Sequence, residues 1–281
     1  MAKTWFITGT SSGFGRLLTE RLLARGDRVA ATVRKPQAVA DLKTQHGDRL
    51  RVASLEMTDS DAIRATIDKA FGELGHIDVI VSNAGYGLFG AAEELDDSQI
   101  RDLIDTNLVG SIQLIRAALP HLRKQGGGRI LQVSSEGGQM AYPGFSLYHA
   151  TKWGIEGFVE SVRQEVEPFG IGLTLVEPGP TQTNFGASLI SSNPADTYKN
   201  TPVGDLRRAF SEGSFDIKGD AGKMVDVMIA SVERNPAPRR LTFGAAAYAS
   251  IRSALQGRLA ELENQKDAAL AMDSDPLTAS N

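Results

Sequence analysis

The chain has 281 residues, of which 41% are hydrophobic and 23% charged, a formal net charge of -4 and no cysteine. This composition is that of a globular protein large enough for one large domain or two small ones. The negative charge and the lack of a long basic run argue against a nucleic-acid partner. Without cysteine there is no disulfide, no thiolate metal site and no cysteine nucleophile. We find no apolar stretch near 18 residues and no signal-peptide pattern, so we expect a cytoplasmic protein outside the membrane.

Short apolar runs alternate with longer amphipathic stretches over the first 180 residues. The amphipathic stretches place apolar side chains at helical spacing, as Ile63, Ile67 and Phe71 do. The apolar runs are continuous, as expected for strands that helices cover on both sides. This pattern predicts an α/β fold with a single Rossmann-like, doubly wound parallel sheet of about seven strands and helices on both faces. The runs cover residues 5–8, 29–33, 50–55, 77–81, 130–133 and 173–176.

The pattern changes after residue 180. Residues 181–219 are rich in Ser, Asn, Pro, Thr and Gly and are predicted to form a variable substrate loop with short helices. A helix over 221–234, a strand over 241–243 that completes the sheet and a helix over 245–266 are predicted to follow. Because no linker divides the chain, we expect one dinucleotide-binding catalytic domain over residues 1–270. Residues 271–281 are predicted to be a flexible tail.

A glycine-rich turn follows the first apolar run and leads directly into a helix. It reads Thr8-Gly9-Thr10-Ser11-Ser12-Gly13-Phe14-Gly15. Glycine lets a diphosphate approach the backbone, and the helix N-terminus offers free N–H groups to it. A glycine pattern between a strand and a helix at the start of a βαβ array predicts a dinucleotide site. The contacts expected from this turn are those of Gly9, Ser11, Ser12, Gly13, Phe14 and Gly15.

The spacing of this turn differs from G-x-G-x-x-G and matches T-G-x-x-x-G-x-G. In this respect the chain resembles the classical branch of the short-chain dehydrogenase/reductase family, over about residues 3 to 245. The resemblance implies an oxidoreductase that uses a nicotinamide dinucleotide. It also implies a homodimer or homotetramer, because members of this family commonly pair through their helices.

The second apolar run bears on the choice of dinucleotide. It is followed by Arg34-Lys35-Pro36 and has no carboxylate to accept from a ribose 2′-OH. The planar guanidinium of Arg34 suits a 2′-phosphate, which predicts NADP(H). The resemblance implies that Ser12 adds a hydroxyl donor. If Arg34 is only a solvated charge, an NAD-preferring alcohol dehydrogenase of the same family is the alternative.

Other cofactor contacts are implied by the resemblance alone. Glu56 replaces the aspartate usual in the family, which leaves the backbone of Met57 as the expected contact beside the adenine. The segment at residues 83–85 would pass the adenine ribose, although a strand-ending Asn-Ala-Gly is also simply a good turn. A Pro-Gly turn would cover the nicotinamide. The residues implied are Glu56, Met57, Asn83, Ala84, Gly85, Pro178, Gly179, Thr181 and Thr183.

Tyr148 and Lys152 are spaced i and i+4 on one face of a predicted helix. By itself this spacing is common, and a surface pair would explain it. Ser135 follows the fifth apolar run at the spacing that the family repeats, and Asn107 lies in a helix as the family's asparagine does. The resemblance implies a catalytic set of Asn107, Ser135, Tyr148 and Lys152, with Tyr148 and Lys152 also contacting the cofactor.

The charges of these groups suggest a mechanism. A free tyrosine has a pKa of about 10, and an adjacent ammonium together with an oxidised nicotinamide favours the phenolate. Tyr148 would then act as general acid and base, and Ser135 would donate to the substrate oxygen. The resemblance implies that Lys152 bonds the nicotinamide ribose and that Asn107 holds a water. His149 is expected to point away from the reacting face, and no metal site is expected.

The substrate expected is an apolar or aromatic carbonyl compound or the corresponding alcohol, and the long loop is expected to close over it. This expectation rests on six side chains that would line the substrate site, and the alternative is that they only pack in the core. The residues are Tyr86, Phe89, Met140, Tyr142, Phe145 and Phe185.

Two rival functions remain open. An NAD(P)-binding sensor without turnover has no evident use for a complete set of reacting residues. Sugar epimerisation or dehydration on the same fold usually needs a larger C-terminal domain than the roughly 100 residues after Gly179 allow.

Overall fold

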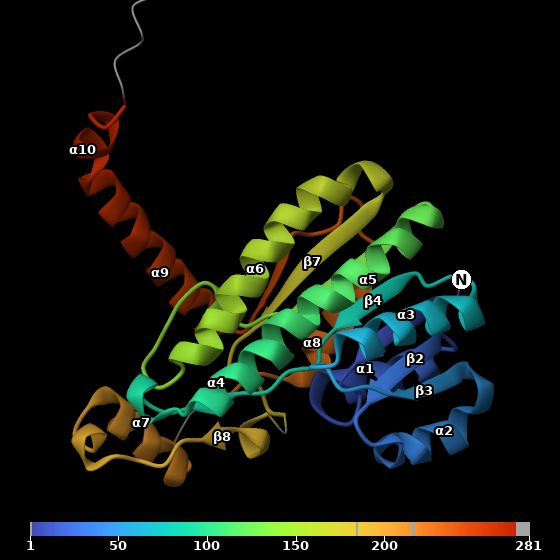
Figure 1. Cartoon of the computed structure of the whole chain (residues 1–281), viewed down its shortest axis with the longest axis horizontal. Coiled ribbons are helices and arrows are strands. Elements are labelled where there is room, and N and C mark those ends of the chain that lie inside the picture. The colour runs from blue at the N-terminus through green and yellow to red at the C-terminus, as the bar shows by residue number, and fades with distance from the viewer. Residues whose placement is uncertain (1, 184, 215–216, 274–281) are drawn as a thin grey trace, which may run out of the picture.

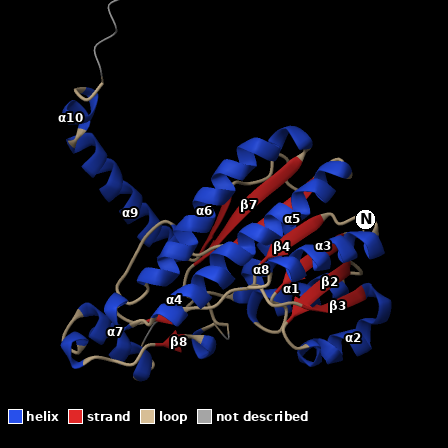
Figure 2. Ribbon diagram, viewed as in Figure 1, coloured by secondary structure: helices blue, strands red, loops and turns tan. Residues whose placement is uncertain are grey.

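The computed structural model of the chain describes residues 2–183, 185–214 and 217–273. A parallel sheet of seven strands in the order β3-β2-β1-β4-β6-β7-β9 runs through the molecule (Figures 1 and 2). A second sheet joins two short strands, β5 and β8, in parallel. The strands are β1 (Thr4–Thr8), β2 (Arg28–Val33), β3 (Leu50–Ser54), β4 (Val79–Ser82), β5 (Leu88–Phe89), β6 (Gly128–Val133), β7 (Ile171–Pro178), β8 (Ile190–Ser191) and β9 (Arg240–Phe243).

Helices cover both faces of the large sheet. Successive residues of a strand face opposite sides, so Trp5 and Ile7 of β1 join one core cluster while Phe6 joins the other. Helices α1, α2 and α8 pack on the first cluster, and α3, α5 and α6 pack on the second. The helices are α1 (Gly13–Ala24), α2 (Ala40–His46), α3 (Ser60–Leu74), α4 (Asp97–Ile104), α5 (Gly110–Lys124), α6 (Ser146–Val166), α7 (Pro202–Ser211), α8 (Ala221–Ser231), α9 (Ala245–Asn264) and α10 (Lys266–Leu270).

This architecture confirms the predicted Rossmann-like, doubly wound parallel sheet. The strand order reverses between β1 and β4, because β2 and β3 extend the sheet on one side and β6, β7 and β9 extend it on the other. Ligands of open α/β sheets bind beyond the carboxyl ends of the strands at such a reversal. The predicted glycine turn and the predicted reacting residues all follow carboxyl ends of strands or lie on the helices beside them.

Some predicted boundaries differ from the structure. Strand β4 begins at Val79 rather than at residue 77, and helix α8 ends at Ser231 rather than at residue 234. The predicted helix over 245–266 is divided into α9 and α10. Within residues 181–219 the chain forms β8 and α7, and the isolated bridge from Thr181 to Gly219 closes its base. Residues 274–281 of the predicted tail lie outside the described residues.

Helix α9 extends away from the body of the molecule (Figure 1). Its first turns are held by buried Ala247 and Ile251, whereas Leu255, Leu259 and Leu262 are exposed. Among the described residues, no helix has both the length and the apolarity needed to cross a bilayer.

Candidate functional site

The glycine turn connects β1 to α1 with very little space around its backbone. Gly9 has a φ of 70°, and a Cβ on it would lie 2.9 Å from Cα of Ala84. A Cβ on Gly15 would lie 2.3 Å from the carbonyl oxygen of Gly9. Both positions therefore require glycine, for conformation at Gly9 and for space at both.

The first turn of α1 is open to an anion. Ser12 is the residue before the helix, but its side chain makes no capping hydrogen bond, and no acidic residue lies in the first turn. The N–H groups and the positive end of the helix dipole are thus not neutralised by the chain's own carboxylates. A Cβ on Gly13 would lie 3.8 Å from Cβ of Thr183, so the fold places the start of the long loop beside this turn. These features fit a dinucleotide diphosphate.

Asn83 lies behind the turn and braces it. Its side-chain nitrogen donates to the carbonyl oxygens of Thr8 at 2.9 Å and Gly9 at 3.1 Å. The Thr8 hydroxyl accepts from the backbone N–H groups of Asn83 and Ala84, each at 3.0 Å. The Asn83 side chain is thus directed at the turn itself, and its predicted contact with the cofactor stays a prediction.

The adenine end is built from exposed residues. Both Arg34 and Glu56 are exposed, and Arg34 forms no salt bridge within the described part of the chain. Burial raises the pKa of Tyr86, and the charge of Arg34 opposes that rise. The N–H of Met57 donates to the Glu56 carboxylate at 3.0 Å, so this predicted backbone contact is already paired within the chain.

Ser135, Tyr148 and Lys152 are brought together by the sheet and α6. Ser135 follows β6, accepts from the N–H of Gly137 at 3.1 Å and acts electrostatically on the Tyr148 phenol. Tyr148 and Lys152 lie in α6, and each is 7% exposed. The ammonium of Lys152 donates to the carbonyl of Val133 at 3.1 Å and lies 5.5 Å from the centre of the Tyr148 ring.

The pKa values of the two groups are displaced in opposite directions by burial. Burial raises the pKa of Tyr148 to about 12, although Ser135 lowers it, and the charge of Glu136 raises it further. Burial also lowers the pKa of Lys152 to about 8, against the opposing effect of Glu156. The sequence led us to expect a lowered tyrosine pKa. In the protein alone the cost of burying the phenolate outweighs the effect of the neighbouring ammonium.

Asn107 lies in a π-helical turn, Asp105–Val109, between α4 and α5. Such turns are rare and frequently mark functional sites. Its side chain accepts from the N–H of Tyr86 at 3.0 Å and donates to the carbonyl of Tyr86 at 2.8 Å. Both of its polar atoms are therefore engaged in holding the segment after β4, and its predicted role with a water stays a prediction.

The predicted Pro-Gly turn follows β7 directly. Gly179 donates its N–H to the carbonyl of Phe243 at 3.0 Å, and Thr181 donates its hydroxyl to the carbonyl of Gly179 at 2.7 Å. A Cβ on Gly179 would lie 3.0 Å from that of Ala247. The turn is thus fixed between the ends of β7 and β9 and the start of α9.

The predicted substrate-lining residues have different surroundings. Phe89 and Phe145 are buried, with ring centres 5.2 Å apart, and both pack against Phe210. Phe185 is 39% exposed, and its ring centre lies 5.7 Å from that of Tyr148. Phe185 therefore gives the side of Tyr148 an apolar, accessible neighbour, whereas Phe89 and Phe145 mainly build the core beneath it.

The other three predicted lining residues are Tyr86, Met140 and Tyr142. Tyr142 packs its ring against His149 with ring centres 4.6 Å apart, and Tyr86 is partly buried against the core that contains Phe89 and Phe145. Met140 accepts at its carbonyl from the indole of Trp153 at 3.4 Å.

Three buried ionisable residues around this centre were not predicted from the sequence: Glu136, His149 and Glu156. His149, which was expected to point away from the reacting face, is buried under the turn after Ser135: a Cβ on Gly137 would lie 2.6 Å from Cδ2 of His149. Neither ring nitrogen of His149 has a hydrogen-bond partner among the described residues, and burial lowers its pKa to about 4.

For Glu156 the sequence did hold a signal, since it follows Lys152 by four residues and interrupts the apolar face of the helix. Among the described residues, no group of three or more His, Cys, Asp or Glu side chains is arranged so that it could hold a metal ion.

The chain is similar to known proteins over most of its length. The family model for short chain dehydrogenase matches residues 3–193. "Oxidoreductase BOA17" of Botryotinia fuckeliana is 35% identical over 246 residues, which cover 87% of this chain and 89% of that protein. Human 17-beta-hydroxysteroid dehydrogenase type 1 is 34% identical over 226 residues, covering 75% of this chain and 66% of that protein.

The fold is shared with solved structures. A short-chain dehydrogenase from Streptomyces avermitilis is 35% identical and superposes with a TM-score of 0.89, covering 97% of this chain and 98% of that chain. Two structures at 20% and 22% identity, each with a TM-score of 0.73, share the fold alone; one was solved complexed with NADH and the other with NADP bound. The sheet order, the glycine turn and the extent of these matches together show that the chain belongs to the short-chain dehydrogenase family of oxidoreductases.

Proposed function

We propose that this protein is an NADP(H)-dependent oxidoreductase that interconverts a ketone or aldehyde and the corresponding alcohol by hydride transfer. The observation that carries the proposal is the buried Ser135–Tyr148–Lys152 group beside the open glycine turn. A phenol with a hydroxyl and an ammonium close by can supply a proton and stabilise charge on a substrate oxygen.

The cofactor would supply the hydride, while the chain supplies position and charge. The turn from Gly9 to Gly15 would hold the diphosphate, and Thr183 lies beside that turn. Arg34 is exposed and has no salt bridge within the described residues, so it is available to a 2′-phosphate. These features favour NADP(H) over NAD(H), and the bound dinucleotides of the more distant structures agree with a nicotinamide cofactor of either kind.

Tyr148 would move the proton at its phenol oxygen. Because burial raises its pKa to about 12, the phenol is protonated near neutral pH, which is the form needed to donate to a carbonyl oxygen during reduction. Ser135 would donate to the same oxygen and stabilise the charge that develops there. Oxidation of an alcohol would instead need the phenolate, which a nearby positive charge favours.

An apolar or aromatic substrate is supported by the surroundings of Tyr148. The accessible ring of Phe185 lies beside Tyr148. A Cβ on Gly87 would lie 2.6 Å from the side chain of Leu189 and 2.8 Å from that of Phe185, so both side chains are close to the backbone after β4. The segment over residues 181–219 would close over the substrate as a lid. We assign residues 1–270 to one catalytic domain, since the large sheet takes strands from Thr4 to Phe243.

A second copy of the chain is the proposed partner. On α9, Tyr248, Leu255, Leu259 and Leu262 are 62%, 47%, 57% and 62% exposed and are spaced by seven, four and three residues, as in a helix-pairing seam. Arg252 lies before the centre of this row of exposed side chains, and Glu261 and Glu263 lie after it. If a second copy of α9 packed antiparallel, the arginine of each copy would therefore lie near the glutamates of the other.

The assembly can be tested by light scattering after size exclusion. Leu259→Glu should reduce the mass of the particle, whereas Ser253→Glu, on another side of the same helix, should not. Equal masses for wild type and Leu259→Glu would count against the α9 seam. The cytoplasmic location stays a prediction that cell fractionation would check.

The enzymatic proposal is tested with a panel of ketones, aldehydes and alcohols, following the absorbance of reduced cofactor. Wild-type protein should oxidise NADPH with at least one carbonyl compound, and Tyr148→Phe should abolish turnover while cofactor binding is retained. A folded protein that binds cofactor but reacts with no member of the panel would leave the sensor alternative in its place.

A further inference from the structure

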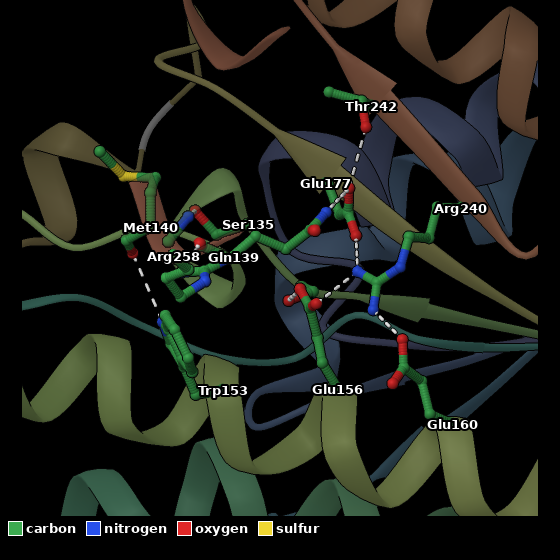
Figure 3. A network of polar contacts seen from close by, with 12 residues as sticks. Ser135, Gln139, Met140, Trp153, Glu156, Glu160, Glu177, Arg240, Thr242 and Arg258 are labelled. Carbon is green, nitrogen blue, oxygen red and sulfur yellow. Dashed lines mark hydrogen bonds and ion pairs between the residues drawn. The ribbon is translucent and has the colours of Figure 1, made fainter. Parts of the chain in front are cut away.

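An ionic cluster lies against α6 one helical turn beyond Lys152 (Figure 3). The guanidinium of Arg240 in β9 contacts the carboxylates of Glu156 and Glu160 in α6 and of Glu177 in β7. The side chains of Glu156 and Glu177 are 4% and 0% exposed, whereas that of Glu160 is 47% exposed. One guanidinium therefore faces three carboxylates, two of which are buried.

The other contacts of the two buried carboxylates are neutral. Glu177 accepts from the side-chain nitrogen of Gln139 at 2.8 Å and from the hydroxyl of Thr242 at 2.9 Å. Glu156 accepts from the hydroxyl of Ser134 at 2.6 Å. These donors satisfy the oxygens but do not cancel their charge, so the cluster has an excess of negative charge on its buried side.

The charge that reaches Lys152 comes from Glu156. Burial lowers the pKa of Lys152, and the Glu156 carboxylate opposes this effect. Burial raises the pKa of Glu156, the hydrogen bonds from Arg240 and Ser134 oppose that rise, and the charge of Glu177 adds to it. Glu136, in the turn after β6, acts on Tyr148. Lys152 and Glu156 lie one turn apart on the same face of α6, and their side chains bond two adjacent residues, Val133 and Ser134.

Glu156 also contacts the turn that bears Ser135. Its hydrogen bond holds Ser134, the residue before Ser135. A Cβ on Gly138 would lie 1.9 Å from Oε1 of Glu156, so the turn is packed directly on this carboxylate. One side chain thus contacts the segment of Ser135 and acts electrostatically on the lysine of α6.

We propose that Glu156 is a positioning residue for the reacting centre, which places a negative charge one helical turn from the Lys152 ammonium and fixes the Ser134–Gly138 turn against α6. The link to catalysis rests on the proposed function, since Lys152 has to serve the reaction for its charge to matter. The electrostatic part can be measured without substrate or cofactor.

The direct test is the titration of Lys152 by NMR in protein labelled with ¹³C at the lysine Cε. The Lys152 signal is identified by its loss in Lys152→Arg. In wild-type protein it should titrate near pH 8. In Glu156→Gln its proton affinity should fall by about tenfold, because a neighbouring carboxylate at low effective dielectric is lost.

Glu160→Gln is the matched control. It makes the same chemical change on the same helix and removes a contact with the same arginine, but at an exposed position one turn further from Lys152. Its Lys152 titration should match that of wild type. A Glu156→Gln midpoint equal to wild type, or an equal shift in Glu160→Gln, would overturn the proposal.

If Glu156→Gln does not fold, the Lys152 titration is measured in Glu156→Asp instead. It keeps the charge but withdraws it by one methylene, so the proton affinity of Lys152 should fall by about two- to threefold. No fall would likewise overturn the proposal. The kinetic readout is the pH profile of carbonyl reduction, whose basic limb should shift to lower pH in Glu156→Gln by the same amount as the titration.

The two proposals fail in different ways. If Lys152 responds to Glu156 but no compound is turned over, the proposed function is wrong and the electrostatic role stands. If turnover is found but the titration and the pH profile do not change in Glu156→Gln, only the role of Glu156 is wrong.

Discussion

The ammonium of Lys152 lies 5.5 Å from the centre of the Tyr148 ring and donates to the carbonyl of Val133, at the end of β6. Both side chains are buried, and burial disfavours the charged form of each. The lysine is therefore held with a pKa of about 8 and the tyrosine with a pKa of about 12. Near neutral pH the centre contains a neutral phenol beside a mostly protonated lysine.

Replacing Lys152 should stabilise the fold while removing activity. Its pKa falls from 10.5 in the unfolded chain to about 8, so the unfolded state binds the proton more tightly. The resulting destabilisation develops as the pH falls from 10.5 to 8 and is complete below that range, at about 1.4 kcal/mol per pH unit. Over this range the effect amounts to about 3 to 4 kcal/mol, of which the loss of the hydrogen bond to Val133 offsets about 1 kcal/mol. Lys152→Met should thus raise the free energy of unfolding at pH 7 by about 2 to 3 kcal/mol and abolish turnover.

Thermal or chemical unfolding measures the stability of this variant. The control is Lys69→Met, which removes a lysine that is 74% exposed and should leave the stability nearly unchanged. A Lys152→Met protein less stable than wild type would show that the buried ammonium is not a net cost.

His149 should make the fold sensitive to acid. Burial lowers its pKa from 6.5 to about 4, so its contribution is fully present above pH 6.5 and is lost as the pH falls toward 4. His149→Phe places an aromatic ring beside Tyr142 and Phe145 and removes the titration. The melting temperature of this variant should therefore fall less between pH 7 and pH 5 than that of wild type.

His76→Gln is the comparison for that experiment, because the His76 side chain is 55% exposed. The loss of stability of His76→Gln on acidification should remain close to that of wild type. An identical pH dependence in wild type and His149→Phe would exclude His149 as the source.

Arg34 should select the cofactor. Arg34→Ala should weaken NADPH binding by about tenfold or more, since a charge-assisted hydrogen bond to a phosphate is lost. NADH lacks the 2′-phosphate, and its affinity should change little. Dissociation constants for both cofactors, measured by quenching of tryptophan fluorescence, decide the matter; an equal loss for NADPH and NADH would sink the phosphate assignment.

Gly138 should be intolerant of a methyl group. An alanine Cβ there would lie 1.9 Å from the Glu156 carboxylate, so either the turn or the carboxylate has to move. We expect Gly138→Ala to lower the free energy of unfolding by about 2 kcal/mol or more and to slow turnover.

Gly157, in α6, is the matched glycine, because a Cβ on it meets nothing within 4 Å. Gly157→Ala should raise the stability by up to about 1 kcal/mol through helix propensity. Comparable unfolding curves for the two alanine variants would contradict the close packing described for Gly138.

Local patterns in the sequence determined much of this protein. The apolar runs predicted the strands of the large sheet up to β7 and the last strand, β9. The reason is that the inner strands are covered on both faces and need apolar residues throughout, whereas the edge strands β3 and β9 are only partly buried. The glycine turn was equally predictable, since the positive φ of Gly9 and the close approach of Gly15 to the carbonyl oxygen of Gly9 arise within one short segment. The same segments identified the family.

Only the tertiary structure decided which distant residues share an environment. Asn83 braces the glycine turn because β4 lies beside β1, and Arg240 meets Glu156 and Glu177 because β9 lies beside β7 under α6. The displaced pKa values of Tyr148 and Lys152 follow from the same cause. Burial depends on what packs around a side chain, and neither helical spacing nor charge order along the chain contains that information.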